Sequence, residues 1–280
     1  MVNIVMPELP EVEVTMRGIS GFLKNSRITD INVYYPKLRE PISEKFSSLH
    51  DLKVLSLARR GKYIIIETDQ GTILIHLGMT GHLLVCDSDL PMKKHDHVEM
   101  VLSNGKTIRF NDQRRFGLFL WFPLGEDVYG SKYLVNLGYE PLTDDFTPEA
   151  LYSSLVHHGR KPVKQALMTN EIVVGIGNIY ASEILFSCRI NPLTPAGHVT
   201  LADCEKMVPI IKTTLLNSIE NGGTTIRDFS GADGKKGYFV QKLNVYGKSN
   251  EKCPVCGCLI ESRVIGGRNT YFCSNCQRIK

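Results

Sequence analysis

Two pairs of cysteines close to the end of the chain constrain its fold more than any other feature. The pairs are Cys253-x2-Cys256 and Cys273-x2-Cys276, and sixteen residues lie between them. This spacing is typical of a tetrahedral zinc site with four cysteine ligands, in which the filled coordination shell makes the ion structural. We therefore predict one structural Zn²⁺. Cys258 could compete as a fifth thiol, although its spacing fits less well.

The segment between the two cysteine pairs is long enough for a β-hairpin. Gly266 and Gly267 permit the positive φ angles of a tight turn, so we expect the hairpin tip at these residues. Arg268 would then point outward from a hairpin stiffened by zinc, a placement that suits contact with a phosphate. A solvated arginine on a turn explains the same pattern equally well.

The composition is that of a globular protein, with 42% hydrophobic and 22% charged residues. A net charge of +4 favours nucleic acid only slightly, but basic residues cluster at 59–62, 114–115, 160–161 and 235–236. No apolar run approaches the ~20 residues of a membrane helix, and the N-terminus lacks the pattern of a secretory signal. We therefore expect no membrane attachment. The cysteines outside the C-terminal segment occur singly, a pattern that indicates the reducing cytoplasm.

The first half of the chain has the pattern of one helix followed by many strands. Residues 8–24 carry apolar side chains at three- and four-residue spacing, which predicts a helix. Short runs rich in β-forming residues predict strands at 31–35, 53–57, 63–68, 72–76, 97–102, 107–110 and 117–122. Strands this short and numerous favour an antiparallel sandwich or barrel.

The pattern becomes helical after Pro141. Helices are predicted at 148–157, 162–168, 178–188 and 201–220, and a mobile loop at 221–236. The fold class is therefore α+β, with an N-terminal β-sandwich domain that has a leading helix, and a C-terminal helical domain with a four-cysteine zinc finger. The expected boundaries are 6–130 for the β-sandwich domain, 131–145 for a linker, 146–236 for the helical domain with its loop, and 244–278 for the finger.

A glycine turn, Gly175-Ile176-Gly177, stands between two of the predicted helices, and Asn178 is a natural cap for the second of them. A helix N-terminus that follows small residues can approach a phosphate closely. A nucleotide-binding fold is the weaker alternative, because no βαβ unit surrounds the glycines. A helix, two turns and a helix that bind the DNA backbone is the preferred interpretation.

Eight motifs, in order along the chain, resemble those of one enzyme family. Besides the cysteine finger they are MPELPEVE at 6–13, RGKY at 60–63, HLGMTG at 76–81, KHDH at 94–97, DQRRFG at 112–117, GIGNIYASEILF at 175–186 and GGTT at 222–225. The family is that of the formamidopyrimidine-DNA glycosylases. The resemblance implies a two-lobed, bacterial-type enzyme that removes oxidised purines (8-oxoguanine and formamidopyrimidines) from duplex DNA and then cleaves the abasic strand by β,δ-elimination.

The resemblance also implies a set of catalytic residues. In the family, the N-terminal amine of the proline after the initiator Met attacks C1′ of the damaged nucleotide, and the matching residue here is Pro7. An α-amine suits this role because its pKa, roughly 7.7–8.0, is below the ~10.4 of lysine. The implied partners are Glu8 as proton shuttle, Glu11 as positioner of the amine, Lys62 as proton donor in β-elimination, and Arg268 as the residue that assists δ-elimination. Without the resemblance, Pro7, Glu8 and Glu11 read as an ordinary helix start.

Contacts with DNA are implied in the same way. The residues that match family positions near the DNA backbone are His95, Arg114, Lys164, Asn178 and Tyr246, with Arg160 aligned less surely. Met79, Arg114 and Phe116 match the side chains that fill the space left by the extruded base. Residues 222–236 match the loop that closes over that base. Taken singly, each of these would more often be a surface, capping or core residue.

The start of the chain departs from the family pattern. Residues 1–5 precede Met6, where the pattern begins. If they persist, Pro7 lies inside a peptide bond and its nitrogen cannot be the nucleophile. Because every later motif is intact, we expect translation to start at Met6 or the extra residues to be removed.

Three alternative functions stay open from the sequence. The endonuclease VIII group prefers oxidised pyrimidines, but Leu9, the 114–116 motif and the 222–236 loop favour the purine-directed group. A non-catalytic lesion-binding protein would follow from a blocked Pro7. A zinc-finger transcription regulator does not explain the N-terminal motifs. We expect damaged double-stranded DNA as the partner, and a monomer in the bacterial cytoplasm.

Overall fold

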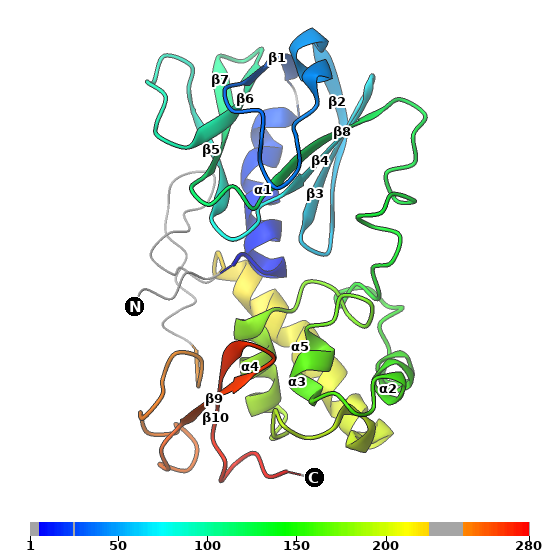
Figure 1. Cartoon of the computed structure of the whole chain (residues 1–280), viewed down its shortest axis with the longest axis vertical. Helices are drawn as coiled ribbons and strands as arrows, with labels where there is room; N and C mark the ends of the chain where they lie inside the picture. Colours follow the sequence, from blue (N-terminus) through cyan, green and yellow to red (C-terminus); the bar gives the residue numbers. More distant parts are fainter. Residues whose placement is uncertain (1–5, 25, 224–242, 280) are drawn as a thin grey trace. The chain divides into compact units, whose positions relative to one another are not determined.

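The computed structural model of the chain describes residues 6–24, 26–223 and 243–279 (Figure 1). Its contacts divide the chain into two compact units. Within the described residues, the first unit contains 6–135 with 221–223, and the second contains 136–220 with 243–279. The first unit is built mainly from strands and the second mainly from helices.

The first unit begins with helix α1, Leu9–Leu23. A capping box starts this helix: the Glu8 backbone N–H donates to Glu11 Oε2 at 2.9 Å, and the Glu8 side chain accepts from the backbone of Glu11. Pro10 is tolerated in the first turn because no amide hydrogen is needed there. The helix ends where its apolar spacing ends, at the buried Leu23. The predicted helix at 8–24 is confirmed.

Eight antiparallel strands form one sheet in the order β5-β7-β6-β1-β2-β3-β4-β8. Their bounds, with the short 3-10 turn η1, are β1 Arg27–Val33, η1 Glu44–Ser48, β2 Leu52–Arg60, β3 Tyr63–Thr68, β4 Gly71–His76, β5 Gly81–Asp87, β6 Asp96–Leu102, β7 Lys106–Asp112 and β8 Leu118–Pro123. Two residue pairs join β1 to β2, Arg27 with Lys53 and Ile28 with Leu52. The short β1–β2 junction divides the sheet into two four-stranded halves.

The two halves of the sheet enclose one apolar core. Ile64 and Ile75 enter it from one half, Met100 and Phe110 from the other, and Ile19 from α1; each is at most 1% exposed. Burial of such side chains contributes roughly 25 cal/mol per Å² of apolar surface. This arrangement confirms the predicted antiparallel β-domain with a leading helix. Strand β5 was not among the predicted strands.

A buried ion pair fastens α1 to β2. Glu13 Oε2 lies 2.8 Å from Arg59 Nε, and Arg59 Nη1 donates to the Gly61 carbonyl at 3.0 Å. The other carboxylate oxygen of Glu13 lies 2.7 Å from Arg17 Nε. The two arginines differ in exposure, because 61% of the Arg17 side chain is exposed against 9% of the Arg59 side chain.

Replacing Glu13 by alanine is expected to lower the free energy of unfolding by about 3 kcal/mol, because the buried Arg59 charge loses the Glu13 carboxylate. Arg17→Ala is the matched control, since it removes only the exposed arm of the same carboxylate and should cost less than about 0.5 kcal/mol. Urea unfolding followed by circular dichroism measures both changes. Equal losses for the two variants would show that the buried pair does not fasten α1.

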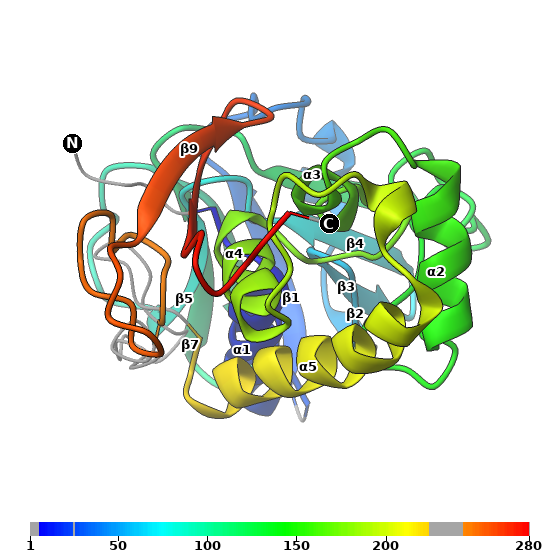
Figure 2. The ribbon, with the colours of Figure 1, turned by 90° about the horizontal axis from the view of Figure 1, so that it is seen from below.

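The second unit is helical (Figure 2). Its elements are α2 Pro148–His157, α3 Val163–Leu167, α4 Asn178–Ser187, the 3-10 turn η2 Ala196–His198, α5 Leu201–Glu220, and the strands β9 Glu261–Ile265 and β10 Arg268–Phe272. Helix α5 packs against both α2 and α4, and the Tyr180 hydroxyl of α4 lies 2.5 Å from Ser218 Oγ of α5. The predictions for α2 and α5 match the observed bounds, the one for α3 is one residue too long at each end, and the one for α4 is one residue too long at its C-terminal end.

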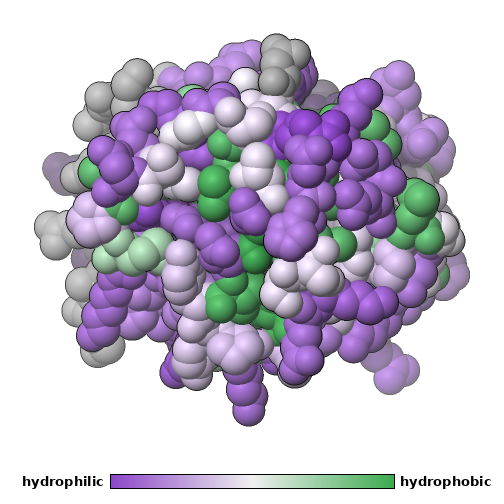
Figure 3. Space-filling model, turned by 90° about the horizontal axis from the view of Figure 1, so that it is seen from above, coloured by the Kyte–Doolittle hydropathy of each residue, from purple (hydrophilic) through white to green (hydrophobic). Residues whose placement is uncertain are grey.

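One face of the molecule carries mainly polar side chains. Figure 3 shows this face, on which an apolar strip near the centre and smaller apolar patches toward the edges are surrounded by hydrophilic residues. Among the described residues, none of the helices combines the length and the apolar character that crossing a membrane requires.

Candidate functional site

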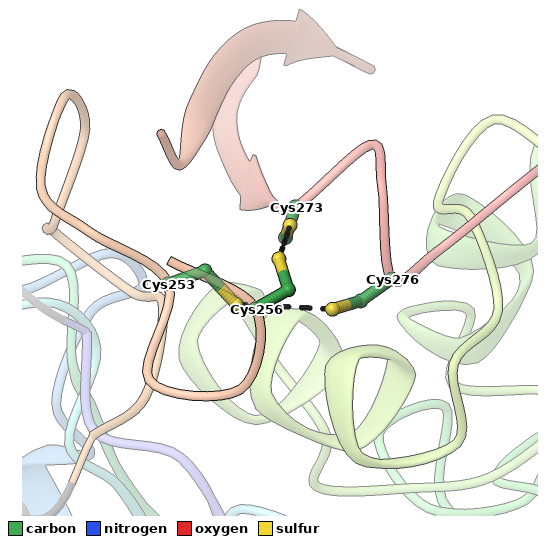
Figure 4. Close-up of side chains that lie close together, drawn as sticks. All are labelled: Cys253, Cys256, Cys273 and Cys276. Carbon is green, nitrogen blue, oxygen red and sulfur yellow. Dashed lines mark hydrogen bonds between the residues drawn. The ribbon is translucent and has the colours of Figure 1, made fainter. Parts of the chain in front are cut away.

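Four cysteine sulfurs converge in the second unit (Figure 4). The Sγ atoms of Cys253, Cys256, Cys273 and Cys276 all lie within 4.8 Å of one another, and the Cys256–Cys273 and Cys253–Cys276 separations are 3.5 Å and 3.9 Å. Zn–S bonds of about 2.3 Å in a tetrahedron place the sulfurs about 3.8 Å apart, so these residues fit zinc. The chain holds one structural Zn²⁺, as predicted. Cys258 is not one of the four, and its carbonyl accepts from Cys253 N at 2.7 Å.

Gln277 fastens the second cysteine pair to the helical part of the unit. This side chain is fully buried; its Oε1 accepts from Cys273 N at 2.9 Å, and its Nε2 donates to the Ile190 carbonyl at 2.8 Å. The Gln277 carbonyl accepts from Asn191 Nδ2 at 2.7 Å. Phe186 of α4 also enters the small apolar core beneath the finger. The zinc site is therefore anchored to the segment that follows α4.

Strands β9 and β10 form a hairpin with the two-residue turn Gly266-Gly267, whose φ angles are +59° and +73°. Positive φ at both positions fits a type I′ turn. A Cβ added to Gly266 would meet Gln165 Nε2 at 2.2 Å, so the hairpin tip lies against α3. Arg268 directly follows the turn, pairs with Ile265 and is exposed. The predicted hairpin tip is confirmed.

Asn178 has a different role from the predicted cap. Gly177 is the cap residue, with extended backbone angles (φ −117°, ψ −153°), and Asn178 is the first residue of α4. Asn178 Nδ2 donates to the Asn269 carbonyl of β10 at 2.8 Å, while its Oδ1 is buried with no hydrogen-bond partner among the described residues. The capping prediction was wrong because Gly177 occupies the cap position and the hairpin engages the Asn178 side chain. Asn178 thus links the start of α4 to the zinc hairpin.

The three other predicted DNA contacts of the second unit have different surroundings. The Tyr246 backbone N–H donates to Glu183 Oε1 at 2.8 Å, and its ring lies 5.1 Å from that of Tyr271. Arg160 is exposed in the turn after α2. Lys164 in α3 is only 1% exposed. A phosphate can therefore reach Lys164 only if the surrounding side chains move.

Pro7 lies directly before α1, and Pro7, Glu8 and Glu11 are all buried. Because Glu11 holds the Glu8 backbone N–H, the capping box fixes the peptide that follows Pro7. Gly223, with φ +79°, lies beside the same carboxylate: an added Cβ would be 3.3 Å from Glu11 Oε1. The start of the predicted closing loop thus lies next to the start of α1.

Lys62 stands with Gly61 (φ +56°) in the two-residue turn between β2 and β3. His76 lies nearby at the end of β4, where its Nδ1 accepts from Gly78 N at 3.0 Å. Burial, together with the charges of Arg39 and Lys62, lowers the pKa of His76 to about 3. His76 is therefore neutral at physiological pH and adds no positive charge beside Lys62.

Three predicted DNA-contacting side chains stand on two loops of the first unit. Met79 lies between β4 and β5, and Arg114 and Phe116 lie between β7 and β8. The Arg114 guanidinium carbon is 4.8 Å from the centroid of the Phe116 ring, which is 42% exposed. An exposed apolar ring of this kind is suited to insertion between bases. His95, with φ +75°, lies close to the second loop because its carbonyl accepts from Asp112 N at 3.1 Å.

Tyr35 and Arg115 belong to the same region but were missed from the sequence. The Arg115 guanidinium carbon lies 4.7 Å from the centroid of the Tyr35 ring, and Arg115 Nη1 donates to the Tyr35 hydroxyl. The only signal in the sequence was the basic pair Arg114-Arg115. The tyrosine is 80 residues away along the chain, so no local pattern could have joined the two.

The predicted site residues therefore lie in two groups, one in each unit. In the first unit, the loops of Met79, His95, Arg114 and Phe116 are adjacent, and Pro7, Glu8 and Glu11 share the start of α1. In the second unit, Asn178 bonds to the hairpin that carries Arg268. Of the predicted closing loop at 222–236, residues 224–236 lie outside the described part of the chain.

Three family models match the chain. One described as the formamidopyrimidine-DNA glycosylase N-terminal domain matches residues 6–119, and one described as the H2TH domain of the same enzyme matches residues 137–230. A third, described as a zinc finger found in FPG and IleRS, matches residues 250–279. Together these matches cover well over half of the chain.

Proteins named formamidopyrimidine-DNA glycosylase, or Fpg, match this chain over nearly its whole length. A formamidopyrimidine-DNA glycosylase of Alteromonas mediterranea is 49% identical over 273 residues, which are 98% of this chain and 100% of the relative. One from Escherichia coli is 47% identical with the same coverage. Among solved structures, MutM (Fpg) from Thermus thermophilus has a TM-score of 0.87 at 32% identity and covers 98% of this chain and 100% of its own. Lactococcus lactis Fpg in complex with DNA containing an abasic site has a TM-score of 0.88 at 30% identity, with 97% and 99% covered. The chain belongs to the formamidopyrimidine-DNA glycosylase family.

Proposed function

We propose that this chain is a base-excision DNA repair enzyme, a glycosylase that removes 8-oxoguanine and formamidopyrimidines from duplex DNA and then acts as a lyase on the abasic strand. The observation that carries the proposal is the start of α1. There a capping box of two buried glutamates fixes the peptide directly after Pro7. Support comes from relatives that are named formamidopyrimidine-DNA glycosylase and from the Lactococcus lactis enzyme, which was solved with damaged DNA.

The first chemical step uses a free Pro7 nitrogen. Its lone pair attacks C1′ of the damaged nucleotide, a C1′–N bond forms, and the base leaves with the electrons of the glycosidic bond and takes up a proton. Opening of the sugar ring then leaves a cationic iminium. Because the pKa of an α-amine is roughly 7.7–8.0, a useful fraction of such an amine is neutral and nucleophilic at physiological pH.

Glu8 and Glu11 have separate tasks in this scheme. Glu8 is adjacent to the nucleophile and moves protons between the amine, the sugar oxygen and water. Glu11 holds the Glu8 backbone N–H at 2.9 Å and so limits rotation of the peptide that follows the amine. Positioning of this kind keeps the nucleophile in a reactive geometry.

Strand cleavage follows from the iminium, which accepts the electrons released when C2′ loses a proton. The 3′ phosphate leaves in β-elimination and the 5′ phosphate in δ-elimination, each with the electrons of its C–O bond. Lys62 serves as proton donor in the first of these steps. Arg268, exposed next to the hairpin turn, holds a phosphate oxygen and stabilises the charge that develops there.

The remaining predicted residues hold the DNA. His95, Asn178 and Tyr246, with Arg160 and Lys164, contact the backbone and set the register. Met79, Arg114 and Phe116 fill the space left by the extruded base, and Arg114 can bond to the base that lost its partner. The loop at 222–236 closes over the extruded nucleotide.

We assign the tasks to domains with the boundaries expected from the sequence. Residues 6–130 are the catalytic domain, 131–145 a linker, 146–236 the helix-two-turn-helix domain with its closing loop, and 244–278 the zinc finger. The ranges matched by the family models support this division. The protein acts as a monomer in the bacterial cytoplasm; the named relatives are bacterial proteins.

Borohydride trapping tests the proposed function directly. Protein with a free Pro7 amine should form a reduced, covalent adduct with a duplex that contains 8-oxoguanine opposite cytosine, and should cleave that strand. Absence of an adduct on both this duplex and one with a preformed abasic site would identify a lesion binder without lyase chemistry.

Oxidised pyrimidines are the second candidate substrate class. A specific observation favours testing them, because Lactococcus lactis Fpg was also solved with DNA containing an oxidised pyrimidine. Single-turnover excision from thymine glycol and 8-oxoguanine duplexes separates the two classes. Faster excision of thymine glycol would replace the purine assignment.

A further inference from the structure

The carboxylate of Asp112 lies at the centre of the two loops that carry Met79, Arg114 and Phe116. The residue is fully buried. Asp112 Oδ1 accepts from the Thr80 hydroxyl at 2.5 Å, and Asp112 Oδ2 accepts from Gly117 N at 2.8 Å. Thr80 belongs to the first loop and Gly117 to the second, so one carboxylate ties the two loops together.

Arg114 is held at the same point. Its backbone N–H donates to Thr80 Oγ1 at 3.0 Å and is 3.3 Å from Asp112 Oδ1. The Arg115 N–H donates to the Asp112 carbonyl at 3.3 Å, and His97 Nε2 also lies 2.8 Å from that carbonyl oxygen. The backbone that leads into Phe116 is therefore fixed at successive residues.

The two loops also touch without intervening side chains. A Cβ added to Gly78 would lie 2.5 Å from both the Gly117 nitrogen and the Phe116 carbonyl carbon. Gly78 has φ +65°, which an L side chain adopts only with strain. The backbone contact and the two bonds to Asp112 together leave the loops little room to shift independently.

We propose that Asp112 is a positioning residue that makes Met79, Arg114 and Phe116 one preformed insertion element, a role that rests on the function proposed above. A side chain that enters the base stack must displace bases, and an element that is ordered before binding avoids the entropy cost of ordering at that moment. Asp112 is fully buried, so we expect no contact between its carboxylate and the DNA. It acts through the loops, so its loss should affect base extrusion and leave the chemistry of Pro7 intact.

Asp112→Asn tests the proposal with little change in volume. The new amide nitrogen is a donor where one carboxylate oxygen accepted. Facing Gly117 it opposes a backbone N–H; facing Thr80 it makes the hydroxyl reverse its role and opposes the Arg114 N–H. We expect single-turnover excision of 8-oxoguanine to fall roughly ten- to a hundredfold, as for the loss of a hydrogen bond to a buried charged group. The fluorescence rise of 2-aminopurine beside the lesion, which reports unstacking, should fall with it. Cleavage and borohydride trapping at a preformed abasic site should stay within about threefold of the parent, since no base needs to be removed there.

Glu99→Gln is the matched control. Glu99 is a buried carboxylate of the same sheet that accepts from Arg109 Nε at 2.9 Å and from the Tyr34 hydroxyl at 3.0 Å. This variant should lower thermal stability but keep the parent ratio of 8-oxoguanine excision to abasic-site cleavage. Thr80→Val removes the bond to Asp112 and the acceptor of the Arg114 N–H, and should give an intermediate loss of excision. Thr80→Ser keeps the hydroxyl and should retain the parent rate.

Two outcomes would overturn the role of Asp112. In one, Asp112→Asn and Thr80→Val excise 8-oxoguanine at the parent rate with the normal 2-aminopurine signal. In the other, they lose excision and abasic-site cleavage in equal proportion, which marks a general structural effect. Failure of the proposed function itself is distinguishable, because the parent protein would then trap no abasic DNA.

Discussion

Protein that begins at Pro7 is expected to form a covalent adduct with abasic DNA on borohydride reduction, whereas protein that retains residues 1–6 is not. The expected difference in rate is at least about a thousandfold, the scale seen when a catalytic nucleophile is removed. The reason lies in one atom. In the longer chain the Pro7 nitrogen is part of a peptide bond, and its lone pair is delocalised into the preceding carbonyl.

If the longer chain still binds DNA, its failure to form an adduct can be assigned to the chemistry of Pro7. The longer chain keeps every other residue of the proposed site, so it should still bind a duplex with a stable abasic analogue. A protease site placed between Met6 and Pro7 provides the matched control, because cleavage in vitro should restore trapping without any change in sequence after residue 6. Intact-mass measurement confirms which N-terminus is present. If the longer chain traps abasic DNA as fast as the cleaved one, Pro7 is not the nucleophile.

Much of the fold could be predicted because its signals are local. The helices at Pro148–His157 and Leu201–Glu220 have apolar residues at helical spacing between clear boundaries, and both were predicted with the observed bounds. The zinc site was equally local, since two CxxC pairs at a suitable spacing supply four thiols for one shell, and the fifth thiol, Cys258, fits that spacing less well. The hairpin tip followed from two adjacent glycines.

The features that escaped prediction depend on contacts between distant segments. Strand β5, Gly81–Asp87, is recognisable through its pairing with β7, and its own pattern of buried and exposed residues is irregular. Asn178 engages a hairpin 91 residues later, so its local resemblance to a cap was misleading. Asp112 belongs to one of the motifs, but its bond to Thr80, 32 residues earlier, has no local signal in the sequence. Burial of Lys164 likewise follows from packing that helical spacing does not specify.

Replacing Cys253 by serine is expected to remove the zinc and to weaken binding to an abasic-analogue duplex by at least about a hundredfold. The apolar core beneath the finger has only a few members, centred on Val245, Ile260 and Tyr271, too few to order the hairpin unaided. Loss of the hairpin removes Arg268 from its place and also takes the Asn269 carbonyl away from Asn178. Two predicted phosphate contacts are therefore lost together.

Cys258→Ser is the control that distinguishes the loss of a zinc ligand from the loss of any other thiol. Cys258 is an exposed thiol two residues after Cys256, but it is not one of the four converging sulfurs. Its substitution should leave one zinc per chain, measured by atomic absorption, and unchanged DNA affinity, measured by fluorescence anisotropy. A Cys253→Ser protein that has lost its zinc yet binds the duplex with parental affinity would show that the finger does not hold DNA. Parental zinc content in that variant would instead show that Cys258 can replace a ligand.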